Sequence, residues 1–291
     1  MVQFSFTQLF NLALPALLFL ALPLHAQLAD SDESYQWGYM SQGMGAFLPT
    51  SLVVDANVNQ LYIKYSQLRN ESNVELPPDF GAVIKTLHDY ISSSAAAGSE
   101  AANGISHLEL ANLITTASFC FGTDPFMIAA KIRRETSFKR TGISTGGAVG
   151  FSQMTGAGIK EVQHQMSGNS NISLSVARNI FQKGIECFIG PSQFNYAVGD
   201  RVSVQNMIQT HPYVDFIFGQ ILTKTYVSYA KSSIVSTLNK EAYRTGFALY
   251  NGDSRLVTGG CMKKRVQLKF EYACDIMTYY NNINSAWTQS Q

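Results

Sequence analysis

The chain has 291 residues, of which 46% are hydrophobic and 14% are charged, so it is long and apolar enough to bury a sizeable core. The formal net charge of +1 gives no support for a nucleic-acid partner. The charge is uneven, with nine acidic and three basic residues in 27–104 against eleven acidic and eighteen basic residues in 105–291. The basic part favours an anionic polymer or surface, with ordinary solvated lysines as the alternative.

Residues 1–26 have the features of an export signal. An almost wholly apolar run, Leu9 to Leu24, is followed by a cleavage-like site that ends at Ala26. The segment has no Lys or Arg, so its positive charge comes from the α-amine alone. An uncleaved anchor is the alternative, but the run is shorter than the roughly 20 residues of a spanning helix and contains two prolines. We therefore expect cleavage near Ala26 and a periplasmic or otherwise exported protein.

The next part of the chain, residues 27–104, is predicted to be an N-terminal extension that is partly helical. Apolar spacings near three and four predict helices over Asn57–Arg69 and Phe80–Ser92. The sequence SSAAAGSEAANG over 93–104 is typical of a linker. We accordingly place a domain boundary at its end, so that residues 105–291 form the main domain.

Helix signals recur through the main domain. Ser106 with Glu109 three residues later is a capping-box pattern. A second start signal has Thr123 or Asp124 as the cap and Pro125 in the first turn. Alternating strand patterns are scarce, so the domain is predicted to be mainly helical. The ranges expected to be helical are 106–119, 125–135, 213–229 and 265–280.

Glu135 stands at the end of the second of these helices. Ile128 and Ile132 lie on the same helix face, so an apolar stripe ends in a carboxylate. Lost solvation and the negative end of the helix both favour the protonated form, which a general acid needs. The alternative is a salt bridge with Lys131, which precedes Glu135 by four residues and is worth only a few tenths of a kcal/mol in that orientation.

The segment around Glu135 resembles the signature of the soluble lytic transglycosylases, bacterial enzymes that cut the glycan strands of peptidoglycan. Gly122–Pro125 is similar to the family's entry to the same helix, and Ala248–Gly252 is similar to its Ala-Tyr-Asn-x-Gly motif. The resemblance covers about Ser106 to Tyr280. The positions that match the central motif are Glu135, Thr136, Phe138, Ser144, Gly147, Ala148, Gly150 and Gln153.

The resemblance implies a mainly α, lysozyme-like domain of the goose-type or lytic transglycosylase kind. It implies that Glu135 protonates the glycosidic oxygen between N-acetylmuramic acid and N-acetylglucosamine. Glu135 then takes the proton of the muramyl C6 hydroxyl, which attacks C1 and leaves a 1,6-anhydro end. No water is consumed, so no second carboxylate is needed. Tyr250 is implied to orient Glu135, with no cofactor and no metal.

The resemblance also implies the residues that bind the glycan. Ser144, Gln153 and Asn251 would contact its N-acetyl groups or the peptide-bearing sugar, and Gly147 would let the backbone approach it closely. Each assignment has a structural alternative. Ser144 could be a turn residue, Gln153 could tie down its own loop, and Tyr250 could be an ordinary core tyrosine.

The chain also departs from the family pattern. Phe151-Ser152 stands where Leu-Met is usual, and the Gly156–Asp215 segment is longer than a compact member needs. Two other functions stay open: a hydrolytic muramidase of the same fold, and a non-catalytic cell-wall binding or assembly protein. The muramidase would need a second carboxylate to activate water. The candidates are Asp253, Asp215 and Asp200.

The four cysteines have neither CxxC spacing nor clustered histidines, so a zinc site is disfavoured. An even count in an exported protein predicts up to two disulfides, of which Cys261–Cys274 is the most local pairing. Unpaired buried thiols are the alternative. The expected partners are peptidoglycan glycan strands, and the acidic extension could bind secretion or envelope-assembly proteins.

Overall fold

The computed structural model describes residues 80–94, 97–140, 143–167, 178–189, 200–235, 240–251 and 271–289, which all belong to one compact unit that begins at Trp37. The predicted export signal and the helix predicted over Asn57–Arg69 lie outside these ranges. Within them the chain is mainly helical and has no strand, only an isolated bridge between Val149 and Met154. The mainly helical class is therefore confirmed. None of the described helices is long and apolar enough to cross a membrane.

The described helices from α4 to α7 follow one another with short connections. The helix predicted over 265–280 is described from Glu271 and continues to Gln289, because Ile283 extends the buried stripe of Ile276 and Tyr280 past two exposed asparagines. The elements are α4 Phe80–Ser93, α5 Glu100–Asn103, α6 His107–Phe121, α7 Pro125–Thr136, α8 Gly156–Ser167, α9 Arg178–Ile189, α10 Arg201–Thr210, α11 Pro212–Ala230, the π-helical turn η4 Lys231–Val235, α12 Lys240–Tyr250 and α13 Glu271–Gln289.

The start signals read from the sequence are confirmed. The Ser106 hydroxyl accepts a hydrogen bond from the Glu109 amide at the start of α6. At the start of α7 the cap is Asp124, whose Oδ1 accepts from the amides of Phe126 (2.8 Å) and Met127 (3.2 Å). Asp124 is buried, and its burial raises the pKa of the carboxyl to about 7.

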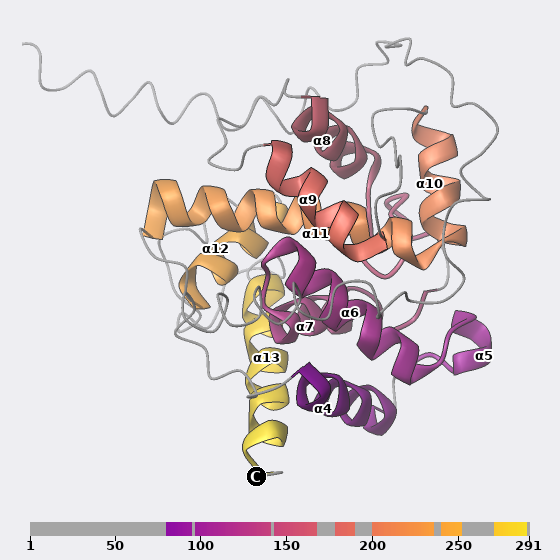
Figure 1. Ribbon diagram of the computed structural model, residues 1–291, viewed down its shortest axis with the longest axis vertical. Coiled ribbons are helices and arrows are strands. Elements are labelled where there is room, and N and C mark those ends of the chain that lie inside the picture. Colours follow the sequence, from indigo (N-terminus) through magenta and orange to yellow (C-terminus); the bar gives the residue numbers. More distant parts are fainter. Residues whose placement is uncertain are drawn as a thin grey trace, which may run out of the picture. The chain divides into compact units, whose positions relative to one another are not determined.

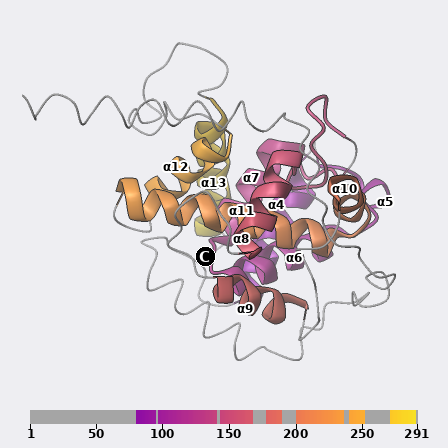
Figure 2. The same cartoon turned by 90° about the horizontal axis from the view of Figure 1, so that it is seen from above.

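The helices enclose one hydrophobic core, which fixes the position of α7. α13 packs along α7, and α12 packs along α11 (Figure 1). α6 contacts α4, α9 and α11, so it lies at the centre of the packing (Figure 2). The Tyr243 hydroxyl of α12 accepts from the Asp124 amide at 2.6 Å and so ties α12 to the start of α7. Most of α7 is consequently buried, and only its last turn reaches solvent.

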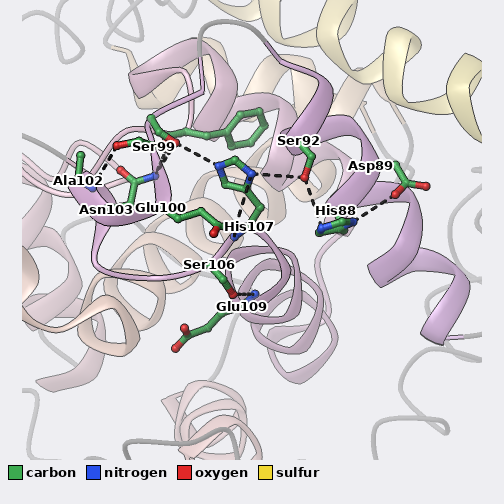
Figure 3. Close-up of polar contacts among 12 residues, drawn as sticks. His88, Asp89, Ser92, Ser99, Glu100, Ala102, Asn103, Ser106, His107 and Glu109 are labelled. Atoms are coloured by element: carbon green, nitrogen blue, oxygen red, sulfur yellow. Dashed lines mark hydrogen bonds and ion pairs between the residues drawn. The ribbon is translucent and has the colours of Figure 1, made fainter.

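α4, which lies in the predicted extension, packs on α6 of the main domain. At the junction Ser92 Oγ lies 3.4 Å from His88 Nε2 and 3.3 Å from His107 Nδ1 (Figure 3). The His107 amide donates to Glu100 Oε1 at 2.7 Å. α4 therefore packs into the same core as the helices that follow Gly104. The domain boundary at Gly104 stays a prediction.

The segment predicted to be a linker contains the one-turn helix α5. Ser99 caps it and Gly104, with φ of 68°, ends it. Asn103 is buried in this turn, and its Nδ2 donates to the carbonyl of Phe138 at 2.8 Å. Its Oδ1 accepts from the Arg140 amide at 3.0 Å. The turn therefore holds the chain that leaves α7, next to the predicted catalytic segment.

A disulfide between Cys120 and Cys187 joins α6 to α9. Cys274 is also disulfide-bonded, whereas Cys261, the remaining cysteine, lies outside the described ranges. The alternative of unpaired thiols is therefore wrong for the three described cysteines. Because α9 belongs to the long 156–215 segment, the disulfide attaches that segment to the central helix.

We expect the double variant Cys120→Ala/Cys187→Ala to lose about 4 kcal/mol of unfolding free energy, because the disulfide closes a long loop. The two cysteines are separated by 67 positions in the sequence. Urea unfolding of the oxidised wild type and of the variant measures the difference. A reductant should lower the wild-type midpoint more than that of the variant. Equal midpoints for both oxidised proteins would contradict the stabilising role.

Candidate functional site

The chain after α7 folds into two turns over residues 144–154. Ser144 Oγ accepts from the Ala148 amide at 2.9 Å, and the Gly147 amide donates to the Ser144 carbonyl at 2.8 Å. The isolated bridge between Val149 and Met154, with N···O distances of 3.1 and 2.8 Å, closes the second turn. This second turn, Val149–Met154, is called the Gly150 turn below.

The carboxylate of Asp215, on α11, holds the Gly150 turn through its backbone amides. The carboxylate accepts from the amides of Phe151 (2.6 Å) and Ser152 (3.2 Å). Gly150 has φ of 76°, and a Cβ atom there would lie 2.5 Å from Asp215 Oδ2. Glycine is therefore required at position 150 by both the backbone conformation and the close carboxylate.

Asp215 was one candidate for the second carboxylate of a hydrolytic enzyme. It is fully buried, which raises the pKa of its carboxyl to about 6 although the amides of the turn oppose the shift. Both of its oxygens accept backbone hydrogen bonds, so its described contacts are those of a structural residue. Asp200 caps α10 through the Ser203 amide at 2.9 Å, and Asp253 lies outside the described ranges.

The Ser152 carbonyl of the Gly150 turn accepts hydrogen bonds from side chains of two helices. It accepts from Lys131 Nζ of α7 at 3.2 Å and from the Tyr250 hydroxyl of α12 at 2.8 Å. The Lys131 ammonium also lies 4.1 Å from the centre of the Tyr250 ring. These contacts bring Tyr250, from the segment that resembles the Ala-Tyr-Asn-x-Gly motif, beside α7 and the turn.

Glu135 lies in the last turn of α7, with 15% of its side chain exposed. Its Oε1 accepts a hydrogen bond from the Tyr272 hydroxyl of α13 and lies 3.7 Å from Lys131 Nζ. Glu135 is thus a partly exposed carboxylate held from two sides. The alternative pairing with Lys131 is present, but in a buried setting, since only 3% of the Lys131 side chain is exposed.

The two tyrosines of the site have different partners. Tyr250, predicted to hydrogen-bond near Glu135 and help orient it, donates to the Ser152 carbonyl, and Tyr272 makes the direct bond to Glu135. Burial raises the pKa of both phenols well above the ordinary value, and the charge of Glu135 adds to the shift. Both hydroxyls therefore remain protonated and act as donors. Tyr272 lies outside all the recognised motifs, so no local sequence signal identified it.

The residues predicted to bind the glycan lie around the Gly150 turn and the end of α12. Gln153 Nε2 donates to the Gly150 carbonyl at 2.9 Å, and the Gly147 carbonyl accepts from Gln205 Nε2 at 3.0 Å. Ser144 and Asn251 are exposed. Within the described structure, Ser144 and Gln153 make the hydrogen bonds that their structural alternatives predicted. Their predicted contacts with substrate stay predictions.

In the described part of the chain, no group of three or more His, Cys, Asp or Glu side chains is placed to hold a metal ion. What the arrangement offers chemically is one accessible carboxyl, two protonated phenols and one buried ammonium. Comparisons with protein-family models, with curated proteins and with solved structures find no match to the chain.

Proposed function

We propose that the chain is an exported peptidoglycan lytic transglycosylase with a lysozyme-like domain. The observation that carries the proposal is the setting of Glu135. A single, partly exposed carboxyl stands at the end of an otherwise buried helix, bonded to a buried tyrosine and beside a turn that contains Gly150 and Gln153. The order and spacing of Glu135, Gly150 and Gln153 resemble the family signature in the sequence.

Glu135 acts first as a general acid. In its protonated form it donates a proton to the oxygen that links N-acetylmuramic acid to N-acetylglucosamine, and the bond from C1 to that oxygen breaks. The proton stays on the departing N-acetylglucosamine hydroxyl. Glu135 is left as a carboxylate, to which the Tyr272 hydroxyl donates a hydrogen bond.

The carboxylate then acts as a general base. The muramyl C6 hydroxyl attacks C1, a bond forms between C1 and O6, and the hydroxyl proton passes to Glu135. The enzyme returns to its protonated state, and no water enters the reaction. A mechanism of this kind needs one carboxyl, which is consistent with the structural contacts of Asp215 described above.

The remaining residues shape the site. Tyr250 orients the turn through the Ser152 carbonyl, and the turn presents Gln153 to the sugar. Ser144, Gly147 and Asn251 contact the N-acetyl groups or the peptide-bearing sugar. The protein acts in the periplasm or another exported location on glycan strands. The extension over 27–104 binds secretion or envelope-assembly proteins.

Digestion of purified sacculi by the mature protein, followed by mass analysis of the soluble products, tests the proposal. We expect muropeptides that end in 1,6-anhydro-N-acetylmuramic acid, lighter by one water than hydrolytic products. Reducing ends would instead indicate the muramidase. Binding to sacculi without any soluble product would indicate the non-catalytic cell-wall protein.

A further inference from the structure

Lys131 is a buried ammonium beside the apolar stripe of α7. Ile128 and Ile132 of that stripe are both buried, and 3% of the Lys131 side chain is exposed. Removing an ammonium from water is costly unless polar partners surround it. Leucine or methionine at this position would fill the same space without that cost. Packing alone therefore does not account for a lysine here.

Lys131 has three described partners: one hydrogen-bond acceptor, one carboxylate and one aromatic ring. Nζ donates to the Ser152 carbonyl at 3.2 Å, lies 3.7 Å from Glu135 Oε1, and faces the Tyr250 ring with 4.1 Å to its centre. The three partners belong to the Gly150 turn, to α7 and to α12. The ammonium is thus the point at which the proposed acid, the turn and the α12 motif meet.

The charged and titratable groups that face this ammonium come from four helices. Glu135 on its own helix and Asp215 of α11 both favour its charged form, while burial lowers the pKa of Lys131. Tyr250 of α12 contributes its ring face, and Tyr272 of α13 donates to the same carboxylate. The ammonium and the Tyr272 hydroxyl therefore approach Glu135 from two different helices.

We propose that Lys131 is a positioning residue for the acid Glu135, and that its ammonium holds the carboxylate that forms when Glu135 gives its proton to the glycosidic oxygen. This inference rests on the proposed function. The charge stabilises the carboxylate relative to the carboxylic acid and keeps it aligned with the Gly150 turn. Lys131 itself exchanges no proton with the substrate.

The direction of the pH effect follows from that charge. Cleavage needs the protonated acid, so the rate falls along the alkaline limb of the pH–rate profile. Removing the ammonium makes the carboxylate less favourable, and the acid keeps its proton to a higher pH. We expect Lys131→Met and Lys131→Gln to move the alkaline limb to higher pH and to lower the maximal rate by about tenfold or more.

The experiment measures release of soluble anhydro-muropeptides from sacculi between pH 4 and 9 by the full mature chain. Lys131→Gln keeps a donor for the Ser152 carbonyl without the charge, and Lys131→Arg keeps the charge. Lys224→Met is a matched control, because Lys224 Nζ also donates to a backbone carbonyl, that of Gly122, at 2.8 Å. Gly122 precedes α7, and Glu135 lies at the other end of that helix.

The expected result is a displaced limb in the Met and Gln variants and a wild-type limb in the Arg and Lys224→Met proteins. A lower rate with an unmoved limb in Lys131→Gln would overturn the inference, because it would show a purely structural role. If the Met and Gln variants do not fold, a displaced limb in Lys131→Arg overturns it and a wild-type limb supports it. A wild type that releases no product at any pH overturns the proposed function, and this inference with it.

Discussion

Replacing Glu135 by glutamine is expected to reduce release of anhydro-muropeptides from sacculi by about 10² to 10⁴-fold, because the amide can neither donate a proton to the glycosidic oxygen nor accept one from the C6 hydroxyl. Glutamine has nearly the same shape, and its carbonyl oxygen can still accept from the Tyr272 hydroxyl. Binding to sacculi should therefore persist. The release rate, measured at equal amounts of bound protein, separates chemistry from binding.

Glu186→Gln provides the matched control for this change. Glu186 is exposed on α9, where its Oε1 accepts from Gln182 Nε2 at 3.0 Å. The same loss of a carboxylate there should leave cleavage at the wild-type rate. If Glu135→Gln cleaves sacculi as fast as the wild type and the Glu186→Gln control, Glu135 is not the acid and the proposed mechanism is wrong.

Gly150→Ala should destabilise the fold by about 3 kcal/mol or more, since the new methyl group meets a buried carboxylate as well as a left-handed backbone. The added Cβ would lie 2.5 Å from Asp215 Oδ2 at a residue with φ of 76°. Asp215 would have to move away from the amides of Phe151 and Ser152. The midpoint of urea unfolding, measured for the variant and the wild type, gives the difference.

Gly147→Ala separates the two causes. Gly147 has nearly the same φ, 74°, but a Cβ atom there would have nothing within 4 Å. We expect a loss of about 1 kcal/mol, from the backbone conformation alone. Equal losses in the two variants would show that the Asp215 contact adds nothing to the requirement for glycine at position 150.

The elements that depend on neighbouring residues could be predicted from the sequence. Ser106 and Asp124 each hydrogen-bond an amide within three residues, so the starts of α6 and α7 follow from local chemistry. The stripe of Ile128 and Ile132 gives the buried face of α7 in the same way, and places Glu135 at its end. Composition alone did not reveal α5, whose single turn is held by Ser99 and Asn103.

The environment of Glu135 was decided by tertiary structure. The spacing of Lys131 and Glu135 predicted a weak pair on neighbouring helix faces. α7 packs instead against α6 and α13, and the Lys131 ammonium is buried beside Ser152 of the Gly150 turn and Tyr250 of α12, where water no longer screens its charge.

The helical class, the start of α7 and the position of one carboxyl at the end of an apolar stripe could all be predicted from the sequence, because each depends on side chains within a few residues. Tyr272 is 137 residues from Glu135, and Asp215 is 64 residues from Phe151. Contacts at such separations leave no periodicity in the sequence, because they form only when the helices pack. Tertiary structure therefore decided which hydroxyl holds Glu135 and which carboxylate makes glycine necessary at position 150.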